Sequence, residues 1–187
     1  MSDLMTRSVG AWQQTTDDVP YLLPAGVRLA DTVSSGVTAA AALDPALATV
    51  AGIAGHDREL PDLSADGFAE RSELDRSTLA ALDAAEAPGL REQAARAAMQ
   101  ERPAVAVVRY DSGDITSDLN VIASWVQHVR EVFDLMPAEG EEAAATVARR
   151  MAAVPEAYRQ FSQTLLGAAR NGRPLGPAAG RGGRQAV

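Results

Sequence analysis

The chain has 187 residues, a formal net charge of −8 and no cysteine. This length fits one domain or one lobe of a larger one. The acidic charge disfavours broad binding to nucleic-acid phosphates, and the lack of cysteine excludes disulfides, cysteine-ligated zinc and a cysteine nucleophile in this chain. Alanine supplies 38 residues whereas aromatic residues supply only 4%, and this composition favours closely packed helices over a sheet.

The first residues are polar, and Pro20 and Pro24 punctuate them. They contain no apolar segment of the kind found in a secretory signal, and no apolar run in the chain approaches the length of a membrane span. We therefore expect a cytoplasmic protein without a membrane partner. Because residues 1–24 lack periodicity, we expect them to form a flexible N-terminal arm.

A first helix is predicted from Val27 to Ala42, because apolar residues recur there at helical spacing. Asp44 and Pro45 then form a helix-start pair, an N-cap followed by proline at the first helical position, for a short helix that ends at Gly52. After a loop, Ser64 is expected to cap a longer helix that reaches about Glu86. The predicted apolar side of that helix consists of Leu74, Thr78, Ala81, Leu82 and Ala85.

The next helix is predicted from Leu90 to about Arg109, with a kink or break at Pro103. Residues 104–108 also fit a short strand, although their helical neighbours favour a helix. Residues 111–120 are expected to form a polar turn. Ser124 and Gln127 then match the S-x-x-Q capping box of a new helix, whose apolar stripe is Val126, Val129, Phe133 and Met136.

Pro137 is expected to end that helix, and three glutamates favour the start of another one close behind it. The predicted stripe of this helix is Ala144, Val147, Ala148 and Met151. Pro155 is expected to begin a last helix, which Asn171-Gly172 closes. Its inward-facing residues are Tyr158, Phe161 and Leu165.

Residues 173–187 are rich in glycine, proline and arginine, so we expect a disordered tail. The sequence therefore predicts an all-α fold, an irregular bundle of about six or seven helices. We divide it into a flexible arm (1–24), a helical domain (25–172) and the Gly/Arg-rich tail (173–187).

The sequence contains no complete catalytic, cofactor-binding or metal-binding motif, and we assign no such residue. Its two histidines, His56 and His128, lack a second histidine at the spacing of a helical zinc site. His56 fits a solvated loop residue better than a metal ligand, and His128 fits a partly exposed helical residue better than a proton-transfer group. A serine nucleophile on a G-x-S-x-G turn and the nucleotide-binding glycine motifs are also absent.

Three aspartates, Asp111, Asp114 and Asp118, lie close together in the predicted turn and superficially suggest calcium. Their spacing does not match an EF-hand loop, so a solvated turn with Asp118 as a helix cap is the simpler interpretation. The tail sequence GRGGR at residues 180–184 resembles an RNA-binding segment, but one copy in an acidic chain favours an inert tail over RNA binding.

An ordered series of short motifs carries a family resemblance, and the longest motif runs from Asp118 to Pro137. The other motifs are Leu43–Pro45, residues 52–57, Leu60–Ser64 and Ala153–Tyr158. Together they resemble the N-terminal portion of the DUF885 family of bacterial proteins over roughly residues 25–170. Two departures stand out: Trp125 replaces the proline usual in the family, and the tail after Gly172 leaves the family pattern.

Members of this family are several times longer and are similar to helical zinc metallopeptidases whose zinc-binding helix lies far downstream. The resemblance therefore implies zinc and a peptide-like substrate only for the longer proteins. It suggests that this chain is an N-terminal helical lobe, truncated and inactive alone, with residues 111–124 nearest the substrate. Its partner would be the missing C-terminal catalytic portion.

Two other interpretations stay open. The chain could be a helical protein-binding or scaffold module without catalysis, whose apolar groove uses the stripe from Val126 to Met136. Alternatively, the polypeptide has no independent function and exposes apolar surface that its missing half would cover.

Overall fold

Seven α-helices and one short 3-10 helix make up the part of the chain described by the computed structural model, which is residues 29–137, 139–173, 175 and 176. No strand occurs in this part, which confirms the predicted all-α fold and the number of helices. The elements are α2 (Leu29–Leu43), α3 (Pro45–Ala51), α4 (Ala65–Ala84), α5 (Leu90–Ser112), α6 (Asp114–Ser117), α7 (Trp125–Glu131), the 3-10 helix η1 (Val132–Leu135) and α8 (Glu141–Arg170).

Three predicted helix ends are confirmed by their local chemistry. The Asp44 carboxylate accepts hydrogen bonds from the backbone N–H groups of Ala46 and Leu47 and so begins α3. The Ser64 hydroxyl accepts the N–H of Gly67 and begins α4. At the other end of α3, Gly52 has a φ of 71°, a left-handed conformation that glycine adopts without strain.

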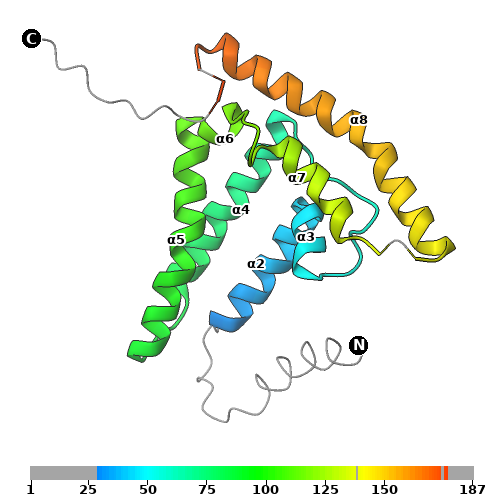
Figure 1. Ribbon diagram of the computed structural model, residues 1–187. Helices are drawn as coiled ribbons and strands as arrows, with labels where there is room; N and C mark the ends of the chain where they lie inside the picture. Colours follow the sequence, from blue (N-terminus) through cyan, green and yellow to red (C-terminus); the bar gives the residue numbers. More distant parts are fainter. Residues whose placement is uncertain (1–28, 138, 174, 177–187) are drawn as a thin grey trace, which may run out of the picture.

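Helices α4 and α5 form a long antiparallel hairpin, and α2 packs along α4 (Figure 1). Across the hairpin, Arg76 forms an ion pair with Asp111 at 2.6 Å and Asp83 accepts a hydrogen bond from Gln100 at 2.6 Å. No residue of α5 is buried, so this helix uses only part of its surface to pack on α4. The hairpin therefore carries a long side that no other described element covers.

The main core lies where the beginning of α4 meets α7 and α8. Its buried members are Leu63, Phe68, Val129, Ala157, Phe161 and Leu165. Helix α8 runs across this region in Figure 1, beyond α7 and α6. The predicted inward positions Phe161 and Leu165 are confirmed, and Tyr158, which is half-buried, donates its hydroxyl hydrogen to the carbonyl oxygen of Val126.

Arg150 on α8 is the largest fully buried side chain in the described part of the chain. Its guanidinium donates four hydrogen bonds to α3 and to the loop that follows α3. The acceptors are the carbonyl oxygens of Glu59 (2.8 Å), His56 (2.7 Å) and Pro45 (3.2 Å) and the hydroxyl of Thr49 (2.9 Å). Arg150 thus fixes a loop without regular structure against α8, because its donors satisfy backbone groups that would otherwise be buried unpaired.

The prediction that Pro155 begins a separate helix is wrong, because α8 continues unbroken through it. The buried positions on either side of Pro155 keep one helical register: Arg150, Ala157, Phe161, Thr164 and Ala168. The half before Pro155 packs on α3 and the loop after it, and the half after Pro155 packs on the core at α4 and α7. This packing outweighs the cost of a proline in a helix interior, about 3 kcal/mol. The predicted stripe ending at Met151 is also wrong, since Met151 is 57% exposed and Arg150 is buried instead.

Helix α5 likewise continues through Pro103, so the expected break and the alternative strand at residues 104–108 do not occur. The polar turn expected at residues 111–120 is also largely helical. Helix α5 extends to Ser112, Gly113 ends it with a φ of 78°, and α6 follows at once. The Ser117 hydroxyl donates to the carbonyl oxygen of Gly113 and stabilises this single helical turn.

Two further predictions need correction. Ser124 occupies the N-cap position of α7, but its hydroxyl contacts the side chain of Gln127 rather than a backbone N–H, so the capping box does not form. After Glu131 the helix tightens into η1, which buries Val132 and leaves Phe133 only half-buried. On α4, Phe68 and Ser72 are buried although they were not predicted, whereas Ala81 is exposed.

The predicted arm, residues 1–24, lies outside the described residues, and so do residues 177–187 of the predicted tail. The division into arm, domain and tail therefore stays a prediction. Within the described part of the chain, none of the helices combines the length and the apolar character needed to cross a bilayer.

Candidate functional site

His128 on α7 lies against Asp44, the residue that caps α3. Their nearest side-chain atoms, Nε2 of His128 and Oδ2 of Asp44, are 3.4 Å apart. The hydrogen bond to Asp44 is the main reason that the pKa of His128 lies above its ordinary value, although partial burial opposes it. Burial alone would raise the pKa of Asp44, but the hydrogen bonds from His128 and from the Leu47 N–H outweigh it and leave this pKa below its ordinary value.

Arg71 on α4 lies beside this pair and contacts two aromatic rings, which also meet each other edge to face. Its guanidinium carbon is 4.6 Å from the centre of the Phe68 ring and 4.9 Å from that of Trp125, distances at which cation–π attraction acts. Trp125 also meets the His128 ring edge to face, with ring centres 5.1 Å apart. The Arg71 guanidinium donates to the carbonyl oxygen of Asp62 at 2.8 Å, while its Nη2 is buried without a hydrogen-bond partner among the described residues.

These side chains form what we call the Asp44–His128 cluster: Asp44, Phe68, Arg71, Trp125 and His128. They join α3, α4 and α7. The pair could exchange a proton, but no serine or threonine hydroxyl in the described part of the chain is hydrogen-bonded to His128, so the arrangement lacks a nucleophile for triad chemistry. The cluster is therefore best understood as a junction between three helices.

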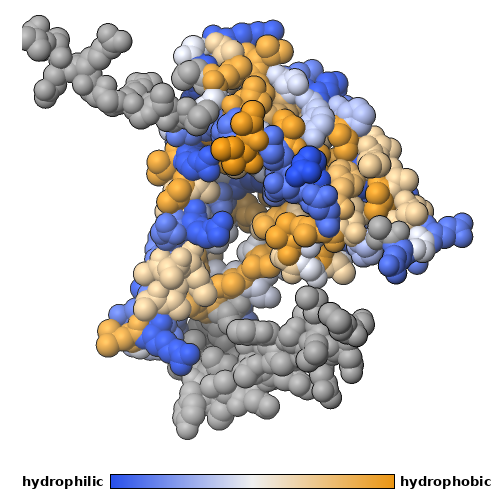
Figure 2. Space-filling model, viewed as in Figure 1, coloured by the Kyte–Doolittle hydropathy of each residue, from blue (hydrophilic) through white to orange (hydrophobic). Residues whose placement is uncertain are grey.

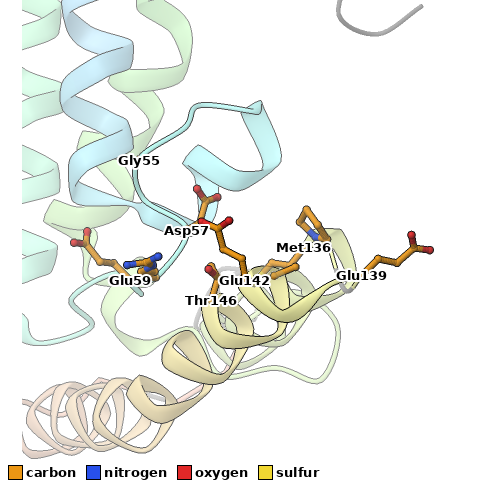
Figure 3. Close-up of a pocket in the computed structure, with 10 residues that line it drawn as sticks. Gly55, Asp57, Glu59, Met136, Glu139, Glu142 and Thr146 are labelled. Carbon is orange, nitrogen blue, oxygen red and sulfur yellow. The ribbon is translucent and has the colours of Figure 1, made fainter. Parts of the chain in front are cut away.

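The other histidine, His56, lies in the loop after α3, with its Nδ1 3.8 Å from Glu59. This loop lines an open pocket of about 680 Å³ against the beginning of α8 (Figure 3). Four carboxylates line the pocket, but Figure 3 shows Asp57 and Glu142 close together while Glu59 and Glu139 point away from them. Accordingly, no group of three or more histidine, aspartate or glutamate residues in the described ranges could hold a metal ion.

The three aspartates considered for calcium do not form one site. Asp111 belongs to α5 and pairs with Arg76, whereas Asp118 follows α6 and lies 3.5 Å from Arg109. Asp114 begins α6. Asp118 is a helix cap as expected, since it is the C-cap residue of α6. The three carboxylates therefore serve separate helix contacts. The arginine-containing segment 180–184 lies outside the described residues.

The 118–124 loop, which joins α6 to α7, holds apolar side chains out into solvent. Val121 is 89% exposed and Ile122 is 80% exposed. The loop is nevertheless ordered by local hydrogen bonds, because the Asn120 side-chain oxygen accepts the N–H groups of Ile122 (2.8 Å) and Ala123 (2.7 Å). The Asn120 side-chain amide in turn donates to Asp118 at 2.7 Å. The fold thus presents an apolar loop tip in a defined conformation.

The apolar stripe proposed as a groove on α7 belongs mainly to the core. Val129 and Met136 are buried, and Val126 and Phe133 are half-buried. Sequence reasoning missed Arg71 and Arg150, the two arginines with the most structural contacts. For Arg150 a signal existed, since it lies three residues after Val147 and four before Val154, in the register of the buried face of α8.

Comparison with known proteins supplies a family but no function. None of the curated proteins matches the chain. A family model described as a bacterial protein of unknown function, DUF885, matches residues 45–180. The match begins later than the resemblance predicted, and it ends later as well. It includes residues 173–180, so the expectation that the family pattern stops after Gly172 is wrong. Because the match covers more than half of the chain, the protein belongs to the DUF885 family.

Proposed function

We propose that this chain is a non-catalytic helical lobe of a hydrolase, and that its 118–124 loop docks onto the part of the enzyme that carries the catalytic residues. In this proposal the whole enzyme is a zinc-dependent hydrolase that acts on peptide-like substrates. The residues that the structure describes do not fit a zinc site, because no three of their carboxylates and histidines converge. In the pocket of Figure 3, Glu59 and Glu139 point away from the other two carboxylates. We therefore assign no step of the reaction to the described residues.

The observation that carries the proposal is the ordered exposure of the 118–124 loop. An apolar side chain in water loses the stabilisation of burial, about 1.5–3 kcal/mol for a residue the size of valine or isoleucine. A loop that needed no partner could relax and bury such side chains, but Asn120 holds Val121 and Ile122 outward. Exposed apolar surface fixed in this way is typical of interaction sites.

The uncovered side of α5 supports the same proposal. This helix has 23 residues and none of them is buried, although Val105 and Val108 are large and apolar. Figure 2 shows apolar residues open to solvent on this face of the molecule, together with a hollow between the helices that surround it. A neighbouring part of the same enzyme would cover such a surface.

A binding experiment with matched variants tests the docking surface. The complete chain is mixed with a separately produced catalytic portion of a longer DUF885 protein, and the affinity is measured by titration calorimetry. We expect Val121→Asp together with Ile122→Asp to abolish binding, because two charges would be buried at the contact. Met151→Asp is the control, since Met151 is an apolar residue that is 57% exposed but lies on α8, outside the 118–124 loop and α5.

Equal binding by the loop variant and the control would show that the loop is not the docking surface. The absence of catalysis is tested separately, by incubating the chain with zinc and a mixture of peptide substrates. We expect no hydrolysis. Hydrolysis that a chelator abolishes would contradict the assignment of the chain as a non-catalytic lobe.

A further inference from the structure

We infer that the chain binds a small carboxylate-bearing molecule in a polar pocket between α4, α5, α6 and α8. The pocket has a volume of about 580 Å³. The polar side chains that line it include Tyr110, Thr116, Gln160, Gln163, Asn171 and Arg173. The inference is independent of the docking proposal, because the exposed tip of the 118–124 loop does not line this pocket.

Gln160 provides a hydrogen-bond donor whose orientation the fold determines. Its side-chain oxygen accepts the backbone N–H of Leu63 at 3.2 Å. Because a backbone N–H can only donate, the atom that it contacts must be the amide oxygen. The NH₂ group of Gln160 is then left to donate, and no acceptor for it lies within the described part of the chain. This donor needs an oxygen from water or from a ligand.

Arg173 supplies a positive charge at the same pocket. It lies so close to Gly113 that a Cβ atom there would be 0.8 Å from its Nη1. The backbone around it is tied to both neighbouring helices, since the Arg173 N–H donates to Ala168 and the Gly176 N–H donates to Ser117. Within the described ranges, no carboxylate lies at ion-pair distance from Arg173. Its charge is therefore available to an anionic group.

Few negative charges compete for these donors. Of the two aspartates that line the pocket, Asp111 already forms an ion pair with Arg76 at 2.6 Å. Asp66 is the other, and it is exposed at the beginning of α4. The positive end of the α4 dipole also lies at the pocket, because Ser64 and Ala65 line it. An arginine, an amide NH₂ and a helix N-terminus that line one pocket are the kinds of group that bind the two oxygens of a carboxylate.

A titration of the complete chain tests this inference by amide NMR, with succinate as the probe and the uncharged succinamide as its matched control. We expect saturable shifts of the Gln160 side-chain amide and of the backbone near Arg173 with succinate only. Arg173→Gln should weaken binding roughly tenfold, the effect of one charge-assisted hydrogen bond. The control Arg170→Gln should leave it unchanged, since Arg170 is exposed and does not line the pocket.

Asp66→Asn is a second variant, whose expected effect on succinate affinity is opposite to that of Arg173→Gln. Its interpretation does not depend on how Arg173 packs. Removing the negative charge of Asp66 should tighten succinate binding, because it opposes the bound carboxylate. Identical shifts with succinate and succinamide would overturn the inference. So would equal affinities of the Arg173→Gln and Arg170→Gln variants, or a failure of Asp66→Asn to tighten binding.

Discussion

Replacing Arg150 with methionine tests whether one buried guanidinium holds the loop after α3 in place. Methionine keeps an unbranched side chain and nearly the same helix propensity as arginine, so the change removes mainly the charged donors. Four acceptors then lose their partner, and three of them are backbone carbonyl oxygens. Those three belong to Pro45, His56 and Glu59, which precede Arg150 by 105, 94 and 91 residues.

The expected loss is large in relation to the stability of a domain. An acceptor left buried without a partner costs about 1–3 kcal/mol. Part of that cost is offset, because removing the guanidinium also removes the free-energy penalty of burying its charge. The same burial lowers the pKa of Arg150. We expect a net destabilisation of about 3–5 kcal/mol, within a total free energy of unfolding of about 5–15 kcal/mol.

Urea unfolding followed by far-UV circular dichroism measures this change, because the helical signal reports on most of the described chain. Arg149→Met is the matched control: Arg149 is the adjacent residue, it is exposed, and it makes no ion pair with another described residue. We expect the control to stay within about 0.5 kcal/mol of the natural sequence. If the two variants unfold at the same urea concentration, the interpretation of Arg150 as the residue that fixes the loop is wrong.

Three further predictions concern single residues. The pKa of His128 is raised above its unfolded value of 6.5, so its pair with Asp44 stabilises the fold fully below that pH. This stabilisation is lost as the pH rises through the folded pKa. His128→Asn should therefore reduce the decrease in the free energy of unfolding above neutral pH. The effect should be about 1 kcal/mol, read from urea midpoints across pH, and unchanged pH profiles would contradict it. Gly67→Ala should destabilise by about 1–3 kcal/mol, because its Cβ would lie 2.4 Å from the carbonyl oxygen of Asp62; a thermal melt identical to that of the natural sequence would refute the steric argument. Pro155→Ala should stabilise α8 by roughly 1 kcal/mol or more, since it restores an N–H inside a continuous helix, and a lower melting temperature would show that the proline is needed.

Local chemistry was enough to predict several helix ends from the sequence. Asp44 with Pro45, Ser64, and Asn171 with Gly172 begin or end helices through contacts within a few residues, so a reader of the sequence sees both partners. The all-α class also follows from composition, because a chain rich in alanine and poor in aromatic residues favours helices. These predictions needed no knowledge of distant contacts.

The predictions that failed depend on contacts between distant segments. Pro155 breaks an isolated helix, but α8 packs on distant segments both before and after it. Arg150 binds α3 and the loop that follows α3, and Phe161 joins the core at α4 and α7. Arg71 and Arg150 are charged, and charged residues are rarely buried without partners. Their partners lie on other elements, such as the aromatic ring of Trp125 for Arg71. A single sequence contains no information about which residues approach each other in this way.

One part of the structure buries its side chains more completely than the other part does. This difference supports the proposal that the chain is a lobe of a larger protein. Where α3, α7 and α8 meet, even an arginine is buried with four hydrogen bonds, and the 52–64 loop is held by backbone contacts. Around α5 and the 118–124 loop, by contrast, valines and isoleucine face solvent although local hydrogen bonds fix the backbone. A fold that buries the charged side chain of Arg150 could also bury the apolar side chains of Val121 and Ile122, which costs less free energy. Their ordered exposure is therefore better explained by a surface that a binding partner covers, as we propose, than by loose packing.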